Sequence, residues 1–179
     1  MGNRGITGEI GEEECARQLE SRGWVVTHLT RIRTNYPNAD LEIEKGSFRR
    51  LIQVKSSRKA RGYVTGGGVS PSVVAGGKIF NRATNYRLCD FVIFLATEHT
   101  RWRYFVVPCE CAEIIFRRNI DAYFKSPRLD GRPRKHSGQA DIFVGGGDFP
   151  HSRIVPDQRS DLLPFEGRWD LLEASEVSA

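Results

Sequence analysis

The residues of this chain best suited to chemistry are an aspartate and, thirteen positions later, a glutamine followed by a lysine. Asp40 begins one run of alternating apolar and polar residues, and Gln53 and Lys55 lie in a second run. Because side chains alternate between the two faces of a strand, Gln53 and Lys55 share one face and Val54 points to the other. A carboxylate, an amide oxygen and a lysine on neighbouring strands can hold a divalent metal ion beside a phosphate group. This combination favours metal-dependent cleavage of a phosphodiester bond.

Each of these side chains has a use in such a reaction, which requires a bound metal ion, an activated water and neutralisation of developing negative charge. Asp40 and Gln53 would supply a carboxylate and a carbonyl oxygen as hard ligands, and Lys55 would orient the water or stabilise the pentacovalent phosphate. A glutamine carries one negative charge fewer than a second carboxylate, which would lower the affinity for the metal. Glu42 could compensate, since it shares a strand face with Asp40 about 7 Å further along. Alternatively, Glu42 is an ordinary solvent-facing acid.

A helix predicted at residues 8–22 offers another carboxylate. On a wheel of about 100° per residue, Ala16 and Leu19 lie within about 40° of Glu12, which places Glu12 within the apolar face of the helix. A carboxylate in that position is costly unless it is paired or bound to a metal ion. Glu12 is therefore a further candidate ligand, acting directly or through a water molecule. The alternative is that Glu12 caps the helix or forms a salt bridge near its start.

The elements that must position these residues follow from periodicity and turn chemistry. Residues 24–29 are apolar and β-branched, and two alternating runs at 39–44 and 50–56 flank the turn residues 45–47, which predicts a strand and then a hairpin. Further along, the sequence predicts a Gly-rich loop at 57–77, a helix at 78–87, strands at 90–96 and 103–107, a helix at 112–124, a short strand at 140–144 and a segment at 169–172 that packs back. This order favours an α/β fold with a central mixed β-sheet flanked by helices.

Length and composition describe one globular domain with an excess of positive charge. The chain has 179 residues, of which 39% are hydrophobic and 27% are charged, with a formal net charge of +5. A positive balance favours a polyanionic partner, although an ordinary solvated surface has the same composition. Basic residues gather around the candidate site and could contact phosphates. They are Arg31, Arg33, Arg58, Lys59 and Arg61.

Several other classes of protein are disfavoured. Four cysteines are few for a secreted disulfide scaffold, and Cys109 and Cys111 have no second pair at metal-ligand spacing. No apolar run reaches the roughly 18 residues of a membrane span, and the first residues lack the apolar segment of a secretory signal. We therefore expect a cytoplasmic protein with no membrane partner. None of the four histidines accompanies a nucleophile motif of the kind found in serine hydrolases.

Together, these motifs resemble those of the PD-(D/E)xK nuclease superfamily. Within it, the general likeness is to archaeal Holliday-junction resolvases and Mrr-type restriction endonucleases. The resemblance covers roughly residues 5–108. It rests on Gly8–Glu12 followed by Gly23–Val26, on Pro37–Asp40 as a stretched PD motif, and on Gln53–Ser57 as the Q-x-K form of the last motif. It implies a restriction-endonuclease-like core of order α-β-β-β-α-β and DNA cleavage dependent on Mg²⁺ or Mn²⁺. The active set that it implies is Glu12, Asp40, Gln53 and Lys55.

The expected organisation is a nuclease-like core over residues 1–125 and a Gly/Pro/Arg-rich extension over residues 126–179, which either belongs to the same domain or forms an arm. The clustered basic residues would then bind DNA, and cleavage of two strands would favour a homodimer. Two alternatives remain open. One is a nuclease-like scaffold that binds nucleic acid without cutting it, for which Gln53 is the supporting feature. The other is an interaction protein in which the motif arises by chance.

Overall fold

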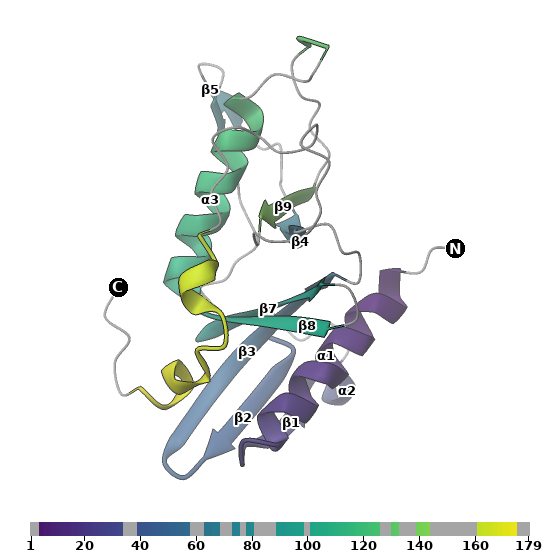
Figure 1. Cartoon of the computed structure of the whole chain (residues 1–179), viewed down its shortest axis with the longest axis vertical. Coiled ribbons are helices and arrows are strands. Elements are labelled where there is room, and N and C mark those ends of the chain that lie inside the picture. The colour runs from purple at the N-terminus through teal and green to yellow at the C-terminus, as the bar shows by residue number, and fades with distance from the viewer. Residues whose placement is uncertain are drawn as a thin grey trace.

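The centre of the molecule is a mixed five-stranded sheet in the order β1-β2-β3-β7-β8 (Figure 1). The structure, a computed structural model, describes residues 4–33, 39–57, 63–68, 73–75, 78–80, 89–98, 101–125, 130–132, 139–143 and 161–174. The strands of this sheet are β1 (Val25–His28), β2 (Leu41–Lys45), β3 (Phe48–Ser57), β7 (Phe91–Glu98) and β8 (Arg101–Pro108). All neighbouring strands are antiparallel except β3 and β7, which are parallel.

Two helices supply most of the packing against this sheet. Apolar residues of α1 (Arg4–Glu20), including Leu19, form one buried cluster with Ile52 and Val54 of β3. Residues of α3 (Cys109–Lys125) form a second cluster with alternate residues of β7, among them Val92 and Phe94. The expected α/β class, with a mixed central sheet flanked by helices, is confirmed. In the described part of the chain, no helix combines the length and the apolar character that a membrane crossing needs.

The β2–β3 hairpin sets the register on which the candidate site depends. Gly46 has a φ of 58°, and the two-residue turn that it begins pairs Lys45 with Phe48. The same register pairs Leu41 with Ile52, so the residues just beyond them, Asp40 and Gln53, lie opposite each other. Residues 53–57 of β3 extend past the start of β2 and continue to pair with β7. On the side where β2 ends, no described strand pairs with residues 53–57, and we call this the open edge of β3 beside Asp40.

The segment at residues 161–174 packs back onto both apolar clusters, as expected for residues 169–172. It contains the short 3-10 helices η3 (Leu163–Phe165) and η4 (Trp169–Glu173). Leu162 is buried in the cluster under α3 and Leu172 in the cluster under α1. The guanidinium of Arg50 on β3 donates to the carbonyl oxygen of Ala174 at 2.7 Å. This part of the C-terminal extension is joined to the core.

Three local expectations are corrected. The first strand ends one residue early, and a four-residue helix, α2 (Leu29–Ile32), follows it. The Gly-rich stretch contains β4 (Tyr63–Gly68), which pairs with β9 (Gln139–Phe143), and β5 (Val73–Ala75), which pairs with β6 (Lys78–Phe80). The helix expected at 78–87 is therefore wrong over residues 78–80, and the remainder lies outside the described residues. Pairing with a partner strand overrides local propensity at these positions, because each strand needs hydrogen bonds from another segment.

Candidate active site

Asp40 is fixed to β3 through both its main chain and its side chain. Its backbone N–H donates to the carbonyl oxygen of Ile52 at 2.8 Å. Its Oδ2 accepts hydrogen bonds from the backbone N–H of Val54 at 2.7 Å and from Nε2 of Gln53. The position of the carboxylate therefore follows directly from the hairpin register, which places Asp40 opposite Gln53.

Gln53 is the buried polar residue of the described core, with 7% of its surface exposed. A buried amide requires hydrogen-bond partners, and Nε2 of Gln53 finds one in the carboxylate of Asp40. Donation through Nε2 leaves the amide oxygen, Oε1, as a hard neutral ligand. This geometry is consistent with the ligand role that the sequence suggested for Gln53.

Glu12 approaches the same edge from α1. The apolar stripe of the helix is formed by buried residues such as Cys15 and Leu19, and Glu12 lies half-buried at its rim. Thr30 of α2 donates a hydrogen bond from Oγ1 to Oε2 of Glu12 at 3.3 Å. Glu12 therefore lies at the rim of the apolar face, whereas the helical wheel placed it within that face, and α2 supplies a partner that the sequence did not indicate.

The pKa values of Glu12 and Asp40 depend on their burial and on the nearby charge of Lys55. Burial raises the pKa of Glu12, and the nearby charge of Asp40 raises that pKa further. Burial also raises the pKa of Asp40, against the lowering effect of its hydrogen bonds. Lys55 opposes both increases in pKa. Two half-buried acids that ionise reluctantly form the kind of site that a divalent cation stabilises.

A very close contact between α1 and β3 sets the separation of these groups. A Cβ atom added to Gly11 would lie 2.2 Å from Oγ and 2.3 Å from Cβ of Ser56. Gly11 directly precedes Glu12, and Ser56 directly follows Lys55. The absence of a side chain at Gly11 therefore allows the helix to bring Glu12 to the strand that carries Lys55.

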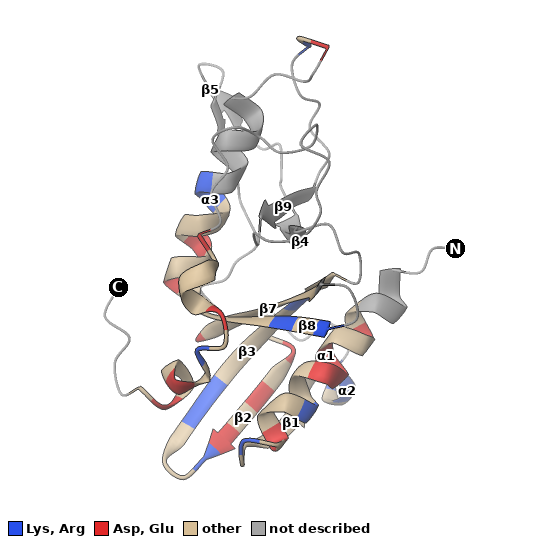
Figure 2. Ribbon diagram, in the orientation of Figure 1, with Lys and Arg blue, Asp and Glu red and all other residues tan. Residues whose placement is uncertain are grey.

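The other predicted site residues have different positions. Glu42 forms an ion pair with Arg49 at 2.6 Å, and among the described residues no three His, Cys, Asp or Glu side chains gather as a metal site would require. Arg31 forms an ion pair with Glu13, and Arg33 is exposed just after α2. The other three predicted DNA contacts, Arg58, Lys59 and Arg61, lie outside the described residues. Figure 2 shows acidic residues along β2 and basic residues on the neighbouring strand β3.

Sequence reasoning missed the parts played by Thr30 and Gly11. No local pattern could indicate Thr30, because the predicted strand ended at residue 29 and no helix was expected after it. A signal for Gly11 did exist, since a glycine at the inner side of a helix commonly marks a close approach. Its partner, Ser56, was not apparent from the sequence.

Comparisons with known proteins concern the fold of this chain. No family model matches the sequence, and no curated protein matches it. Among solved structures, the bacterial homing endonuclease I-Ssp6803I is similar, with a TM-score of 0.57 and 15% sequence identity. The similarity covers 96% of this chain and 93% of that chain. The chain therefore shares its α/β fold with this endonuclease over nearly its full length.

Proposed function

We propose that this chain is a Mg²⁺-dependent endonuclease of restriction or resolvase type, which hydrolyses phosphodiester bonds in DNA. The observation that carries the proposal is the convergence of Glu12, Asp40, Gln53 and Lys55 at the open edge of β3. The fold shared with a homing endonuclease supports DNA as the substrate and hydrolysis as the reaction. The convergence of these four residues is independent of that similarity.

The donor set fits a hard divalent cation. Asp40, Gln53 and Glu12 would hold Mg²⁺ or Mn²⁺ through oxygen atoms, which both ions prefer. The bound ion would polarise the phosphate and activate water. Burial raises the pKa of both carboxyl groups, and a cation between them would offset that unfavourable charge. Lys55, close to both acids, would neutralise the charge that develops on the phosphate.

Basic residues that come before and after these strands in the sequence would bind the flanking phosphates. Arg31 and Arg33 belong to the α2 segment, which reaches Glu12 through Thr30. Three more basic residues follow the end of β3, at Arg58, Lys59 and Arg61. Contacts with phosphates would make DNA binding strongly dependent on salt concentration. Cleavage of both strands of a duplex would require two sites, which favours a homodimer.

A cleavage assay tests the proposal. We would incubate wild type, Asp40→Asn and Lys55→Ala with supercoiled plasmid, linear duplex and four-way-junction DNA, in Mg²⁺, Mn²⁺ or EDTA. We expect cleavage that requires the metal and falls by roughly 100-fold or more in both variants. Glu44→Gln is the matched control, since Glu44 is an exposed acid of β2 paired with Arg49 at 3.5 Å. Equal behaviour of wild type and Lys55→Ala on every substrate would show the proposal to be wrong.

One observation favours a second candidate function. Gln53 stands where another carboxylate would strengthen a metal site, and its amide already donates to Asp40. A scaffold with this arrangement could bind nucleic acid without cutting it. Calorimetric titration with Mg²⁺ separates the two functions, because an inactive scaffold would show no cation site that disappears in Asp40→Asn. The same scaffold would still retain DNA on a filter at low salt.

A further inference from the structure

Thr30 has no role in the proposed reaction, yet its side chain lies against one of the candidate ligands. Its hydroxyl donates a hydrogen bond from Oγ1 to Oε2 of Glu12 at 3.3 Å. Within the described part of the chain, this is the hydrogen bond that the Glu12 carboxylate accepts. The contact occupies one carboxylate oxygen and leaves the other, Oε1, available to a cation or to a water molecule.

The backbone fixes Thr30 relative to the second acid of the site. Leu29, the buried residue just before it, donates its N–H to the carbonyl oxygen of Asp40 at 2.9 Å. The single turn of α2 is closed by a bond from the N–H of Arg33 to the carbonyl oxygen of Leu29 at 3.0 Å. α2 thus contacts Asp40 through its main chain and Glu12 through a side chain.

We propose that Thr30 is a positioning residue, which holds the carboxylate of Glu12 beside Asp40 in the arrangement that binds the divalent cation. Two carboxylates repel each other, and a half-exposed glutamate can relieve the repulsion by turning toward solvent. The hydroxyl of Thr30 opposes that movement, as groups that hydrogen-bond to metal ligands commonly do. The inference rests on the proposed function, since it concerns the same cation site.

A purely structural role for Thr30 makes a different prediction. If the hydroxyl only completes the packing of α2 against α1, its removal would lower the stability of the fold and leave cation affinity unchanged. A nearby ion pair between Arg31 and Glu13 also joins these two helices. Both of its partners are largely exposed, so it does little to hold them together. The decisive readout is therefore cation affinity, measured beside stability and tested for rescue by serine.

The experiment compares Thr30→Val, which keeps the shape of the side chain and removes its hydroxyl, with Thr30→Ser, which keeps the hydroxyl. Mg²⁺ and Mn²⁺ are titrated into the whole chain by calorimetry without DNA, and thermal unfolding is followed in parallel. We expect Thr30→Val to weaken cation binding by about 10-fold or more, and Thr30→Ser to restore it. Thr27→Val is the matched control, because Thr27 is exposed on β1. Thr30→Ala replaces the valine variant if that variant does not fold.

The outcomes distinguish this inference from the proposed function. A wild-type cation site that depends on Asp40, with equal affinity in Thr30→Val, would overturn the role of Thr30 and leave the proposed function standing. Equal weakening by serine and valine would also overturn it, since the hydroxyl would then be irrelevant. Absence of any cation site that depends on Asp40 in wild type would overturn both. In a Glu12→Gln background, Thr30→Val should weaken binding no further, because the group that it positions is already changed.

Discussion

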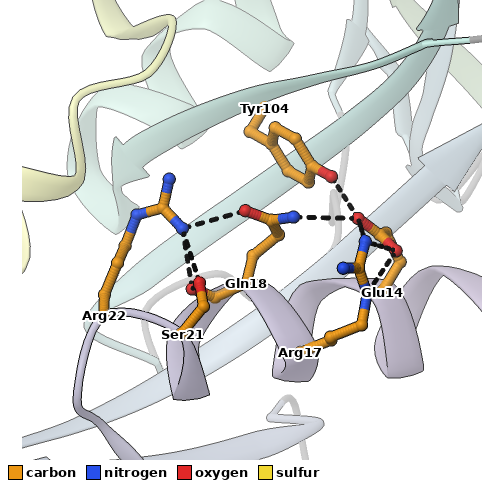
Figure 3. A network of polar contacts seen from close by, with 6 residues as sticks. All are labelled: Glu14, Arg17, Gln18, Ser21, Arg22 and Tyr104. Carbon is orange, nitrogen blue, oxygen red and sulfur yellow. Dashed lines mark hydrogen bonds and ion pairs between the residues drawn. The ribbon is translucent and has the colours of Figure 1, made fainter.

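Glu12 and Glu14 lie two residues apart on α1, and their carboxylates have opposite surroundings. Glu14 accepts hydrogen bonds from Arg17 at 2.7, 2.8 and 3.1 Å, from Gln18 at 3.3 Å, and from the hydroxyl of Tyr104 on β8 (Figure 3). Its side chain is 12% exposed. Glu12 is half-buried as well, but in the described part of the chain it accepts a single hydrogen bond.

The pKa values of the two acids shift in opposite directions. Burial would raise the pKa of Glu14, but the hydrogen bonds from Arg17, Tyr104 and Gln18 bring it below its usual value. Burial raises the pKa of Glu12, and the charge of Asp40 adds to that increase. Hydrogen bonds from protein groups stabilise the charge of Glu14, whereas the charge of Glu12 is disfavoured by its surroundings. Unmatched buried charge is typical of functional sites, because a ligand is expected to complete it.

The contacts around Glu14 extend into a purely structural junction. The guanidinium of Arg22 donates to Oε1 of Gln18 at 2.9 Å and stacks 4.4 Å from the ring centre of Trp169 in η4. The ring of Trp169 lies 5.5 Å from that of Tyr104. This network joins α1, β8 and the C-terminal segment, so its polar groups hold these elements together.

The largest expected effect separates the two acids directly. We expect Glu12→Gln to reduce cleavage by about 100-fold or more, with the free energy of unfolding unchanged or slightly higher because repulsion from Asp40 is lost. Glu14→Gln should keep its cleavage rate and lose about 1–3 kcal/mol of the free energy of unfolding, since charge-assisted hydrogen bonds are removed. Cleavage rates and urea denaturation measure both quantities. The reverse pattern would contradict the division between a functional and a structural acid.

A second pair of variants tests how α1 brings Glu12 to β3. Gly11→Ala places a methyl group against Ser56, and we expect a loss of about 1–3 kcal/mol of stability together with reduced cleavage. Gly8→Ala is the control on the same helix, since a Cβ atom there meets nothing within 4 Å. That control should gain about 0.5–1 kcal/mol from the better helix propensity of alanine. Adding Ser56→Gly to Gly11→Ala should restore cleavage, and failure to do so would place the damage elsewhere.

A smaller effect on stability is expected from the hydrogen bond between Tyr104 and Glu14. Tyr104→Phe removes one hydrogen bond to Glu14, and we expect it to lower the free energy of unfolding by about 1 kcal/mol with little change in cleavage. Chemical denaturation and the cleavage assay provide the two measurements. In a Glu14→Gln background the same substitution should cost less, because the charged partner is gone. An equal loss in both backgrounds would assign the effect to packing of the ring.

The smallest effects concern pH, and the two acids differ in sign. The folded-state pKa of Glu14 lies below its ordinary value of 4.5, so its stabilising contribution is present above that pH and disappears as the pH falls through the folded-state pKa. The pKa of Glu12 is raised, so its ionisation destabilises the fold as the pH rises past 4.5. Urea denaturation from about pH 3 to about pH 7, comparing each Gln variant with wild type, measures both trends. Parallel curves for the two variants would contradict the opposite signs.

The sequence alone determined the parts of the site that depend on short-range geometry. Strand alternation places Gln53 and Lys55 on one face, and the turn residues around Gly46 predict the hairpin that joins them to Asp40. The exact register, which sets Asp40 opposite Gln53, came from the structure. Helical periodicity placed Glu12 at the inner side of α1. The strands β7 and β8 and the helix α3 were also predicted, β7 from its unbroken apolar run, because the signal for each lies within its own residues.

Tertiary structure decided which acid keeps an unmatched charge. Glu12 and Glu14 are the same residue type about 200° apart on α1. Arg17 and Gln18 reach Glu14 from its own helix. The bond to Glu14 from Tyr104 comes from β8, and the charge that raises the pKa of Glu12 comes from Asp40. The contact of Thr30 with Glu12 likewise depends on the turn of α2, which is held by a backbone bond to Asp40. The pairing of β4 with β9 joins segments remote in sequence. Local patterns cannot encode such contacts, because each requires two separately folded segments to meet.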